Sequence, residues 1–285
     1  MKKKLAEAPS GYQEKVTGYF QSISAHWNEV YKPGNVYAET LRARHAAVLA
    51  WIDSLALAPG SQALEIGCGP GFMAIALAQR GLHVQAIDSS EAMIRQAHLN
   101  AIEAGTADII EANVGDVYSL AFNDNSFDLV FAIGLLPWLA QAELAIRELA
   151  RVTKPGGYVI LTAANWKGLP EFLDPQLNPT LAPLRRSVRA SLKRMGFRVG
   201  LPEDLPKMIY HRPNFIGEAL SRAGLLKIRE QTIGFGPFSF LCHTVLPERL
   251  GLAIHHRLQR LADRNVPVVR STGMSYHVLA QKPTA

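Results

Sequence analysis

A short apolar run that carries an acid ends in three glycines at alternate positions, Ala-Leu-Glu65-Ile-Gly67-Cys-Gly69-Pro-Gly71. A helical pattern follows at once. This order predicts a strand, a tight turn and a helix, because glycine adopts backbone conformations that other residues avoid and lets the backbone approach a ligand closely. The N–H groups at the start of the helix are expected to face that ligand. The segment therefore predicts a ligand-binding turn.

Three acids are expected beside this turn. Glu65, Asp88 and Asp116 fall at or near the carboxyl ends of predicted strands. These ends meet at the edge where a parallel sheet binds its ligand. Three carboxylates there would repel a pyrophosphate. They suit a ligand that carries a cationic ammonium and sulfonium and has ribose hydroxyls.

The spacing of the glycines argues against two common nucleotide sites. A dinucleotide fingerprint needs a third small residue three positions after the second glycine, and Phe72 stands there because Gly71 comes one position early. The Gly-Lys-Ser/Thr sequence of a P-loop is absent from the segment. Nicotinamide-dependent oxidoreduction is therefore disfavoured.

Alternating strands and helices position these residues. Ser89 or Ser90 is expected to cap the helix after the second strand, and Lys154-Pro-Gly-Gly157 predicts a turn before the fifth. This alternation implies a parallel sheet with helices on both faces. Strands are predicted over 62–66, 83–88, 108–114, 127–133, 158–162, 226–233 and 275–280, and helices over 38–55, 72–80, 141–152 and 215–223.

Four regions are expected along the chain. They are an N-terminal cap or lid with the first helix (1–57), a cofactor-binding core (58–165), a substrate-side insertion (166–213), and a segment that completes the sheet and carries a second insertion at 234–270 (214–285).

Composition places the chain among ordinary globular proteins. Its 285 residues are 48% hydrophobic and 19% charged, with a net charge of +6 that permits an anionic partner without requiring nucleic acid. The longest apolar run is shorter than the roughly 20 residues that cross a bilayer. No apolar signal-peptide region follows the first lysines. Two distant cysteines indicate no disulfide framework and no metal spacing, so a cytoplasmic protein is expected.

Five segments follow one another along roughly residues 60–163, and the pattern returns in the last helix and strands. The segments are 65–71, 86–90, 115–117, 127–134 and 154–157. Together they resemble the class I, Rossmann-like S-adenosylmethionine-dependent methyltransferases of the small-molecule type, such as the quinone-pathway enzymes and methyltransferase type 11. One glycine motif would be a weak signal, but the five together are specific for the class.

The resemblance implies an α/β fold with a doubly wound, mostly parallel seven-stranded sheet, helices on both faces, the last strand antiparallel, an N-terminal helical cap and two insertions. It implies S-adenosylmethionine as cofactor and S-adenosylhomocysteine as product. Glu65 would lie near the cofactor's ammonium, Asp88 would accept from the ribose hydroxyls, and Asp116 would accept from the adenine amino group. The cofactor set is Glu65, Gly67, Cys68, Gly69, Gly71, Asp88, Ser89, Met93, Asp116, Val117, Ala132 and Gly134.

Within this set the glycine turn would hold the methionine part. Val117 and Met93 would pack on the rings, and residues 132–134 would line the sulfonium side. The Asn/Asp-Pro-Pro-Tyr/Phe motif that amide and adenine methyltransferases carry after the fourth strand is missing, since that place reads Gly134-Leu-Leu-Pro-Trp138. The His-His pair of many small-molecule members is missing there too. No metal site is expected.

The sequence indicates the binding site of the methyl acceptor less clearly than that of the cofactor. A base matters if the acceptor is a hydroxyl. His211, which follows the Pro-rich insertion, and His26, beside Trp27 in the N-terminal cap, are the candidate catalytic residues; a capping or core-edge role is the alternative for His211. The other histidines considered are His45, His243, His255 and His256.

A basic amphipathic stretch at 184–198 contains no acid. It is either a solvated helix face or a contact for an anionic substrate, a carrier protein or a membrane surface. The leading hypothesis is methyl transfer to a small-molecule hydroxyl by in-line displacement, driven by positioning and desolvation. The alternatives are an RNA or protein methyltransferase, with nucleic acid disfavoured, and a non-catalytic S-adenosylmethionine-binding protein. The sequence does not indicate the oligomeric state.

Overall fold

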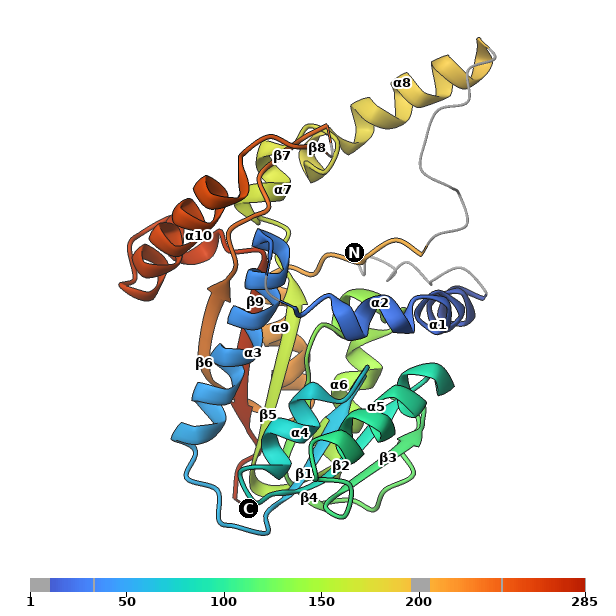
Figure 1. The fold of residues 1–285 in the computed structure, drawn as a ribbon, viewed down its shortest axis with the longest axis vertical. Coiled ribbons are helices and arrows are strands. Elements are labelled where there is room, and N and C mark those ends of the chain that lie inside the picture. The colour runs from blue at the N-terminus through green and yellow to red at the C-terminus, as the bar shows by residue number, and fades with distance from the viewer. Residues whose placement is uncertain (1–10, 33, 196–205, 242, 285) are drawn as a thin grey trace.

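The computed structural model describes residues 11–32, 34–195, 206–241 and 243–284. A seven-stranded sheet in the order β3-β2-β1-β4-β5-β9-β6 forms its centre (Figure 1). β9 pairs antiparallel with β5 and β6, and the other six strands run in one direction. This confirms the predicted fold class. The strands are β1 (Gln62–Ile66), β2 (His83–Asp88), β3 (Ile110–Val114), β4 (Phe127–Ala132), β5 (Thr153–Ala164), β6 (Leu226–Ile233) and β9 (Ser275–Gln281).

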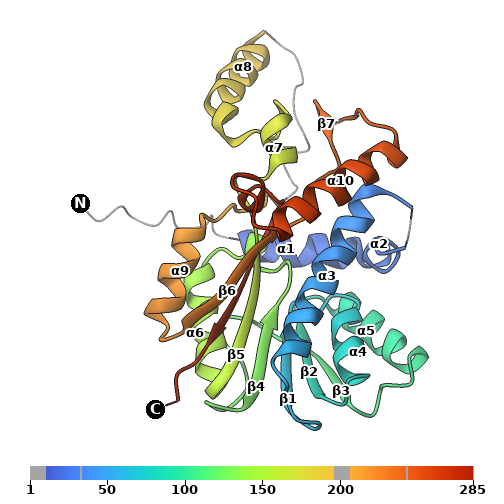
Figure 2. The ribbon, with the colours of Figure 1, turned by 90° about the vertical axis from the view of Figure 1, so that its left-hand side faces the viewer.

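Both faces of the sheet are covered by helices (Figure 2). Because successive side chains of a strand point to opposite faces, Leu129 and Phe131 of β4 pack in one core and Val130 and Ala132 in the other. Helices α3 (Val36–Ser54), α4 (Phe72–Ala78) and α5 (Glu91–Glu103) cover the first face, and α6 (Ala142–Val152) and α9 (Pro213–Arg222) cover the second. The Ser90 hydroxyl caps α5 by accepting from the Met93 amide, as predicted.

The turn predicted at 154–157 is wrong. These residues belong to β5, which begins at Thr153. They form an irregularity in the pairing with β4, where Phe127 faces Thr153 but Leu129 faces Tyr158. The Lys154 ammonium holds the bulge by donating to both carboxylate oxygens of Asp128 at 2.9 Å. Residues with a strong turn preference therefore form a bulge within a strand.

The remaining elements gather above the carboxyl ends of the parallel strands (Figure 1). α1 (Tyr12–Ser22) and α2 (Ser24–Glu29) lie across this edge, and α10 (Glu248–Asp263) packs near α3. α8 (Ala182–Arg194) extends away from the sheet in both views (Figures 1 and 2). Smaller elements are the 3-10 turns η1 (Leu136–Trp138), η2 (Pro179–Leu181) and η3 (Val269–Ser271), helix α7 (Leu169–Leu173), and strands β7 (Ser239–Phe240) and β8 (His243–Thr244). Among the described helices, none is long and apolar enough to cross a membrane.

Candidate active site

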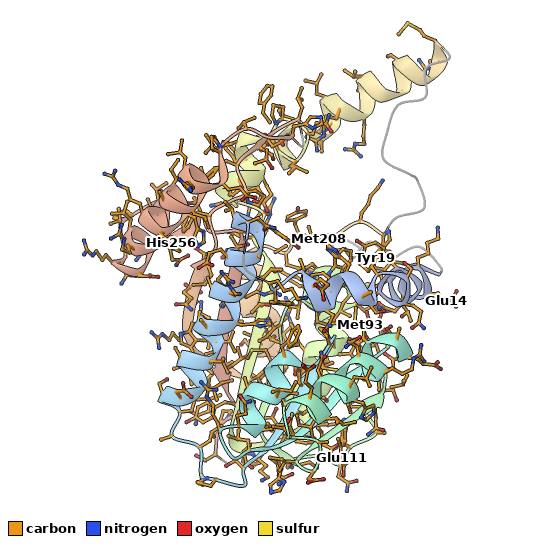
Figure 3. The ribbon with its side chains drawn as sticks, in the orientation of Figure 1. Glu14, Tyr19, Met93, Glu111, Met208 and His256 are labelled. Atoms are coloured by element: carbon orange, nitrogen blue, oxygen red, sulfur yellow. The ribbon has the colours of Figure 1, made fainter. Side chains whose placement is uncertain are left out.

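A chamber of about 790 Å³ lies at the carboxyl ends of the parallel strands. Its size falls in the range of small-molecule and cofactor sites. One half is built by the glycine turn and the ends of β1, β2 and β3, and the other by the ends of β5 and β6, α7 and the segment before α9. Figure 3 shows Met93 and Met208, which both line the chamber, on the side of the sheet that the N-terminal helices cover.

The backbone of the glycine turn is already hydrogen-bonded within the protein. The amides of Gly67 and Cys68 donate to the Ile87 carbonyl at 2.8 and 3.0 Å. The Gly69 amide donates to Asp88 Oδ2 at 3.0 Å, and the Gly71 amide donates to the Cys68 carbonyl at 3.0 Å. These four amides of the turn are therefore occupied within the protein. The prediction that N–H groups at the start of the helix face the ligand concerns α4, which begins at Phe72, and it stays a prediction.

Two glycines of the turn are required by space and conformation. Gly67, Gly69 and Gly71 all have positive φ, which strains any other residue. A Cβ on Gly67 would lie 3.0 Å from Leu135 Cδ1, and one on Gly71 would lie 3.0 Å from Ala97 Cβ. A Cβ on Gly69 would meet nothing within 4 Å and would project into open space. Gly67 and Gly69 line the chamber, whereas Gly71 seats α4 against α5.

Asp88 connects the turn to α5. Its Oδ1 accepts from the Ser90 amide at 2.9 Å while Oδ2 accepts from Gly69. Burial raises the pKa of the Asp88 carboxyl, and the amides of Ser90, Gly69 and Ser89 partly offset this increase. Each oxygen has a second lone pair, so the carboxylate can accept from a ligand as well.

Glu65 on β1 is the most desolvated acid of the chamber. It is 3% exposed, and its Oε2 is buried with no hydrogen-bond partner among the described residues. Burial raises the pKa of this carboxyl well above its ordinary value, and the Ala74 amide at the start of α4 opposes that rise. An unpartnered buried carboxyl is costly. A cationic ligand group at this place would relieve the cost.

Arg44 was missed as a site residue. It belongs to α3, lines the chamber and forms no ion pair with any carboxylate of the described residues. Its Nε is buried and unpartnered, and one Nη donates to the Tyr31 hydroxyl at 3.2 Å. A Cβ on Gly134 would lie 2.9 Å from the guanidinium, so the positive φ and the missing side chain at Gly134 make room for it. Arg44 and Glu65 both influence the pKa of Tyr31, which places opposite charges around one end of the chamber.

The remaining predicted cofactor residues divide into two groups. Those that line the chamber are Cys68, Ser89, Met93, Asp116, Val117 and Gly134. Asp116 Oδ1 accepts from the Tyr118 amide at 2.9 Å, which fixes the turn after β3. Burial raises the pKa of the Cys68 thiol well above its ordinary value, which disfavours the reactive thiolate form. Ala132 is fully buried in the sheet core and does not line the chamber.

The N-terminal helices are held over the chamber by polar contacts with the β2–α5 corner and α5. The Gln21 side-chain oxygen accepts from the Ser90 hydroxyl at 2.8 Å and from the Ala92 amide at 3.1 Å. The hydroxyls of Thr17 and Ser89 are 3.0 Å apart. Aromatic residues of these two helices and of the segment that follows them, Phe20, Trp27 and Tyr31, line the chamber. These contacts place the N-terminal helices over the chamber.

Neither predicted catalytic histidine lines the chamber. The His211 ring stacks on Phe215 with centroids 5.0 Å apart, and its Nε2 lies 3.3 Å from the Leu136 carbonyl oxygen. Burial lowers the pKa of His211. His26 lies beside Trp27 on the outer side of α2, in a separate shallow cavity with Glu29 and Lys32. These contacts give His211 a packing role and leave His26 away from the chamber.

The half of the chamber beyond β4 carries a carboxyl that the sequence did not indicate. Glu171 of α7 lines this half together with Met208, Met274 and Ile233. The Thr162 hydroxyl of β5 accepts from the Gly134 amide at 2.6 Å and joins the two halves. Among the described residues, no group of three or more His, Cys, Asp or Glu side chains could hold a metal ion.

Comparison with known proteins agrees with this geometry. Residues 64–161 match the model of the methyltransferase domain family. The sheet around them has six parallel strands and one antiparallel strand, with the glycine turn after β1 and an acid at the end of β2. Residues 64–161 form a class I methyltransferase domain. The methyltransferase domain thus contains the glycine turn, Asp88 and Asp116, whereas Arg44 and Glu171 come from segments outside it.

Curated relatives are similar over this domain. A ubiquinone biosynthesis O-methyltransferase of Paracidovorax citrulli is 36% identical over 117 residues, 41% of this chain and 49% of the relative. A malonyl-acyl-carrier-protein O-methyltransferase of Erwinia billingiae is 38% identical over 112 residues, 39% of this chain and 42% of the relative. The chain thus matches about half the length of these relatives or less.

Solved structures match nearly the whole chain. The magnesium protoporphyrin IX methyltransferase of Synechocystis PCC 6803, solved with bound S-adenosylhomocysteine, superposes with a TM-score of 0.64 at 20% identity and covers 95% of this chain and 99% of its own. A (4+2)-cyclase superposes with a TM-score of 0.60 at 20% identity and covers 95% of this chain and 96% of its own. At this identity the likeness establishes the fold alone.

Two histidines beside the methyltransferase domain make stability depend on pH. His277 is buried, and His45 is half-buried on the lining of the chamber. Burial lowers the pKa of His45, which stacks on Tyr31, and of His277, which packs on Trp51, to about 3 in each case. Both ring nitrogens of His277 are buried without a described partner. The folded protein keeps these rings neutral, while the unfolded chain takes up protons as the pH falls below about 6.5. Each histidine therefore removes stability on acidification.

We predict that His277→Leu flattens this dependence. Between pH 7.5 and pH 5, the variant should lose about 2 kcal/mol less unfolding free energy than the unsubstituted protein, measured by urea unfolding. Acids with a raised pKa, such as Glu65, act in the opposite direction in both proteins, so the difference between the two curves isolates the histidine. His98→Leu on the exposed side of α5 is the control. Parallel curves for H277L and the unsubstituted protein would contradict the assignment.

Proposed function

We propose that this chain binds S-adenosylmethionine and transfers its methyl group to the hydroxyl of a small molecule. The observation that carries the proposal is a carboxyl and a guanidinium beside the glycine turn, neither of which has an ion-pair partner among the described residues. Glu65 provides a buried carboxyl and Arg44 a guanidinium without an ion-pair partner among the described residues. An α-amino acid is a zwitterion, so its ammonium and carboxylate match these two groups. The methionine part of the cofactor has this character.

The strand order supports positions for the ribose and adenine of the cofactor at the ends of β2 and β3. Asp88 at the end of β2 accepts from the ribose hydroxyls with the lone pairs that the amides leave free. Asp116 after β3 accepts from the adenine amino group, and Met93 and Val117 pack on the ring. When bound, the sulfonium supplies an electrophilic methyl group. The residues of this chain hold the donor in place, and the N-terminal helices exclude water from it.

We further propose that the regions divide this work. The core at 58–165 holds the cofactor, the N-terminal helices form a lid, and the segments after β5 and β6 surround the acceptor. The volume of about 790 Å³, continuous between both halves, supports a small acceptor over a large polymer. The curated relatives matched over the domain include O-methyltransferases, which supports an oxygen acceptor. A cofactor-binding protein that catalyses no methyl transfer is the alternative, since a cyclase has this fold.

Isothermal titration calorimetry with S-adenosylhomocysteine tests the cofactor site. The unsubstituted protein should bind it, and Asp88→Asn should weaken binding at least about tenfold, because charge-assisted hydrogen bonds to two hydroxyls are lost or weakened. Glu103→Gln, an exposed change on α5, is the matched control and should bind normally. If the unsubstituted protein bound NAD but not S-adenosylhomocysteine, the proposed function would be wrong.

One observation favours an acceptor carried by an acidic protein. α8 extends from the body and contains basic residues with no acid between Ala182 and Arg194 (Figure 1). Arg185 anchors the helix by donating to the carbonyls of Pro175 and Asn178, while Arg186 and Arg194 are exposed. Residues 196–198 of the predicted basic stretch lie outside the described residues. One curated relative is a malonyl-acyl-carrier-protein O-methyltransferase. We propose α8 as the contact for such a carrier.

Binding of fluorescent malonyl-acyl-carrier protein tests this contact. The double variant Arg186→Glu/Arg194→Glu should weaken binding at least about fivefold at low salt, since charge attraction between exposed groups is reversed. S-adenosylhomocysteine binding should not change. Arg249→Glu on α10 is the control for a general change of surface charge. Equal carrier binding by the α8 variant and the unsubstituted protein, or none by either, would contradict the contact.

A further inference from the structure

The acceptor half of the chamber contains one buried carboxyl that no step of the proposed function has used. Glu171 is 8% exposed and lines the chamber. Its Oε2 is buried with no hydrogen-bond partner among the described residues. No described lysine, arginine or histidine forms an ion pair with it. A carboxyl that gains so little from its protein surroundings is destabilising unless it has another role.

The local sequence shapes the space for this carboxyl. A Cβ on Gly168 would lie 2.2 Å from Glu171 Oε2 and 3.0 Å from its Cδ. Gly168 has an ordinary negative φ, so its backbone conformation does not require glycine. A side chain at position 168 would occupy the space that the Glu171 carboxyl fills. The missing side chain at Gly168 therefore allows the carboxyl to take this position at the start of α7.

The topology places Glu171 on the acceptor side. Donor groups follow β1, β2 and β3, whereas α7 follows β5 on the other side of β4. The Gly134 amide and the Thr162 hydroxyl join the ends of β4 and β5, so both halves open on the same chamber. Met208, Met274 and Ile233 also line this half of the chamber. Glu171 is a buried carboxyl on the same lining.

We propose that Glu171 is the general base that receives the proton of the acceptor hydroxyl. This inference rests on the proposed function and deepens it. The acceptor oxygen forms its bond to the transferred methyl carbon while its proton passes to the Glu171 carboxylate. The carbon–sulfur bond breaks, and its electron pair stays on sulfur as a neutral thioether. The proton then leaves to solvent, so charge and atoms balance.

The electrostatics of Glu171 suit this step. Burial raises its pKa to about 7, and Tyr210, whose own pKa is raised to about 12, is the titratable side chain that it influences. A base is most effective when its pKa lies near the working pH, because it is then available and still basic.

Two acceptor probes of different acidity test the proposal. Catechol needs a base, whereas 4-nitrocatechol has a much more acidic hydroxyl and ionises without one. Glu171→Gln should lower kcat/KM for catechol about 100-fold or more, and should change the value for 4-nitrocatechol much less. The rate of catechol methylation by the unsubstituted enzyme should rise with pH through about 7. This rise should be absent from the pH–rate profile of E171Q. Glu171→Asp should restore part of the catechol activity.

Two further variants separate a base from a packing residue. Gly168→Ala pushes the carboxyl aside without removing it, and should reproduce the selective loss on catechol. Glu218→Gln on the exposed face of α9 should behave normally. All variants should bind S-adenosylhomocysteine as the unsubstituted protein does. This binding separates failure of the inference from failure of the proposed function, which would remove the binding itself.

Three results would overturn the inference. E171Q could lose activity equally on both probes, which would mean that Glu171 positions the acceptor or packs against its neighbours and is not the base. E171Q could keep full activity on catechol. The unsubstituted protein could bind S-adenosylhomocysteine and methylate neither probe, which would contradict Glu171 as the base for a hydroxyl acceptor.

Discussion

The architecture of the chamber depends on a buried carboxyl at the end of the central strand. Glu65 is almost fully buried on β1, and one of its oxygens has no described partner. Arg44 approaches the same end from α3 without an ion-pair partner among the described residues. Isolated charges in a protein interior are destabilising. A ligand that carries both signs of charge stabilises both groups when it lies between them. We infer that the two groups serve to bind such a ligand.

This constraint organises the surrounding elements. The glycine turn brings backbone close to Glu65, and its amides bond to Ile87 and Asp88, which fixes β1 against β2. The absence of a side chain at Gly134 leaves space for the Arg44 guanidinium. The N-terminal helices lie over the chamber and contact the start of α5 through Gln21. Donor groups thus collect on one side of β4, and the less polar acceptor half forms on the other.

The sequence predicted what depends on local spacing. The strand–turn–helix at the glycines, the placement of Glu65, Asp88 and Asp116 at or near strand ends, and the Ser90 cap follow from patterns of a few residues. The seven-stranded, mostly parallel sheet with its antiparallel last strand follows from the resemblance to the class. The sequence did not predict Arg44 or Glu171. Each is a single charged residue whose role is set by how α3 and α7 pack on the sheet. The predicted helix over 38–55 did not indicate which of its residues lies against the chamber.

The histidines show the converse error. His211 follows the Pro-rich insertion, where an acceptor contact is expected, but its ring packs on Phe215 and contacts the Leu136 carbonyl instead. The turn predicted from Lys154-Pro-Gly-Gly157 became a bulge in β5, because pairing with β4 and the bonds from Lys154 to Asp128 outweigh the local preference. In both cases tertiary contacts that no short pattern reports decided the outcome.

The most direct test of the central claim is a crystal structure of the complex with S-adenosylhomocysteine. We predict that the α-amino group contacts the Glu65 carboxyl, that the α-carboxylate contacts the Arg44 guanidinium, and that the ribose hydroxyls contact Asp88. A complex in which the amino-acid end lies elsewhere, with Glu65 Oε2 still unpartnered and Arg44 turned away from the ligand, would contradict the account.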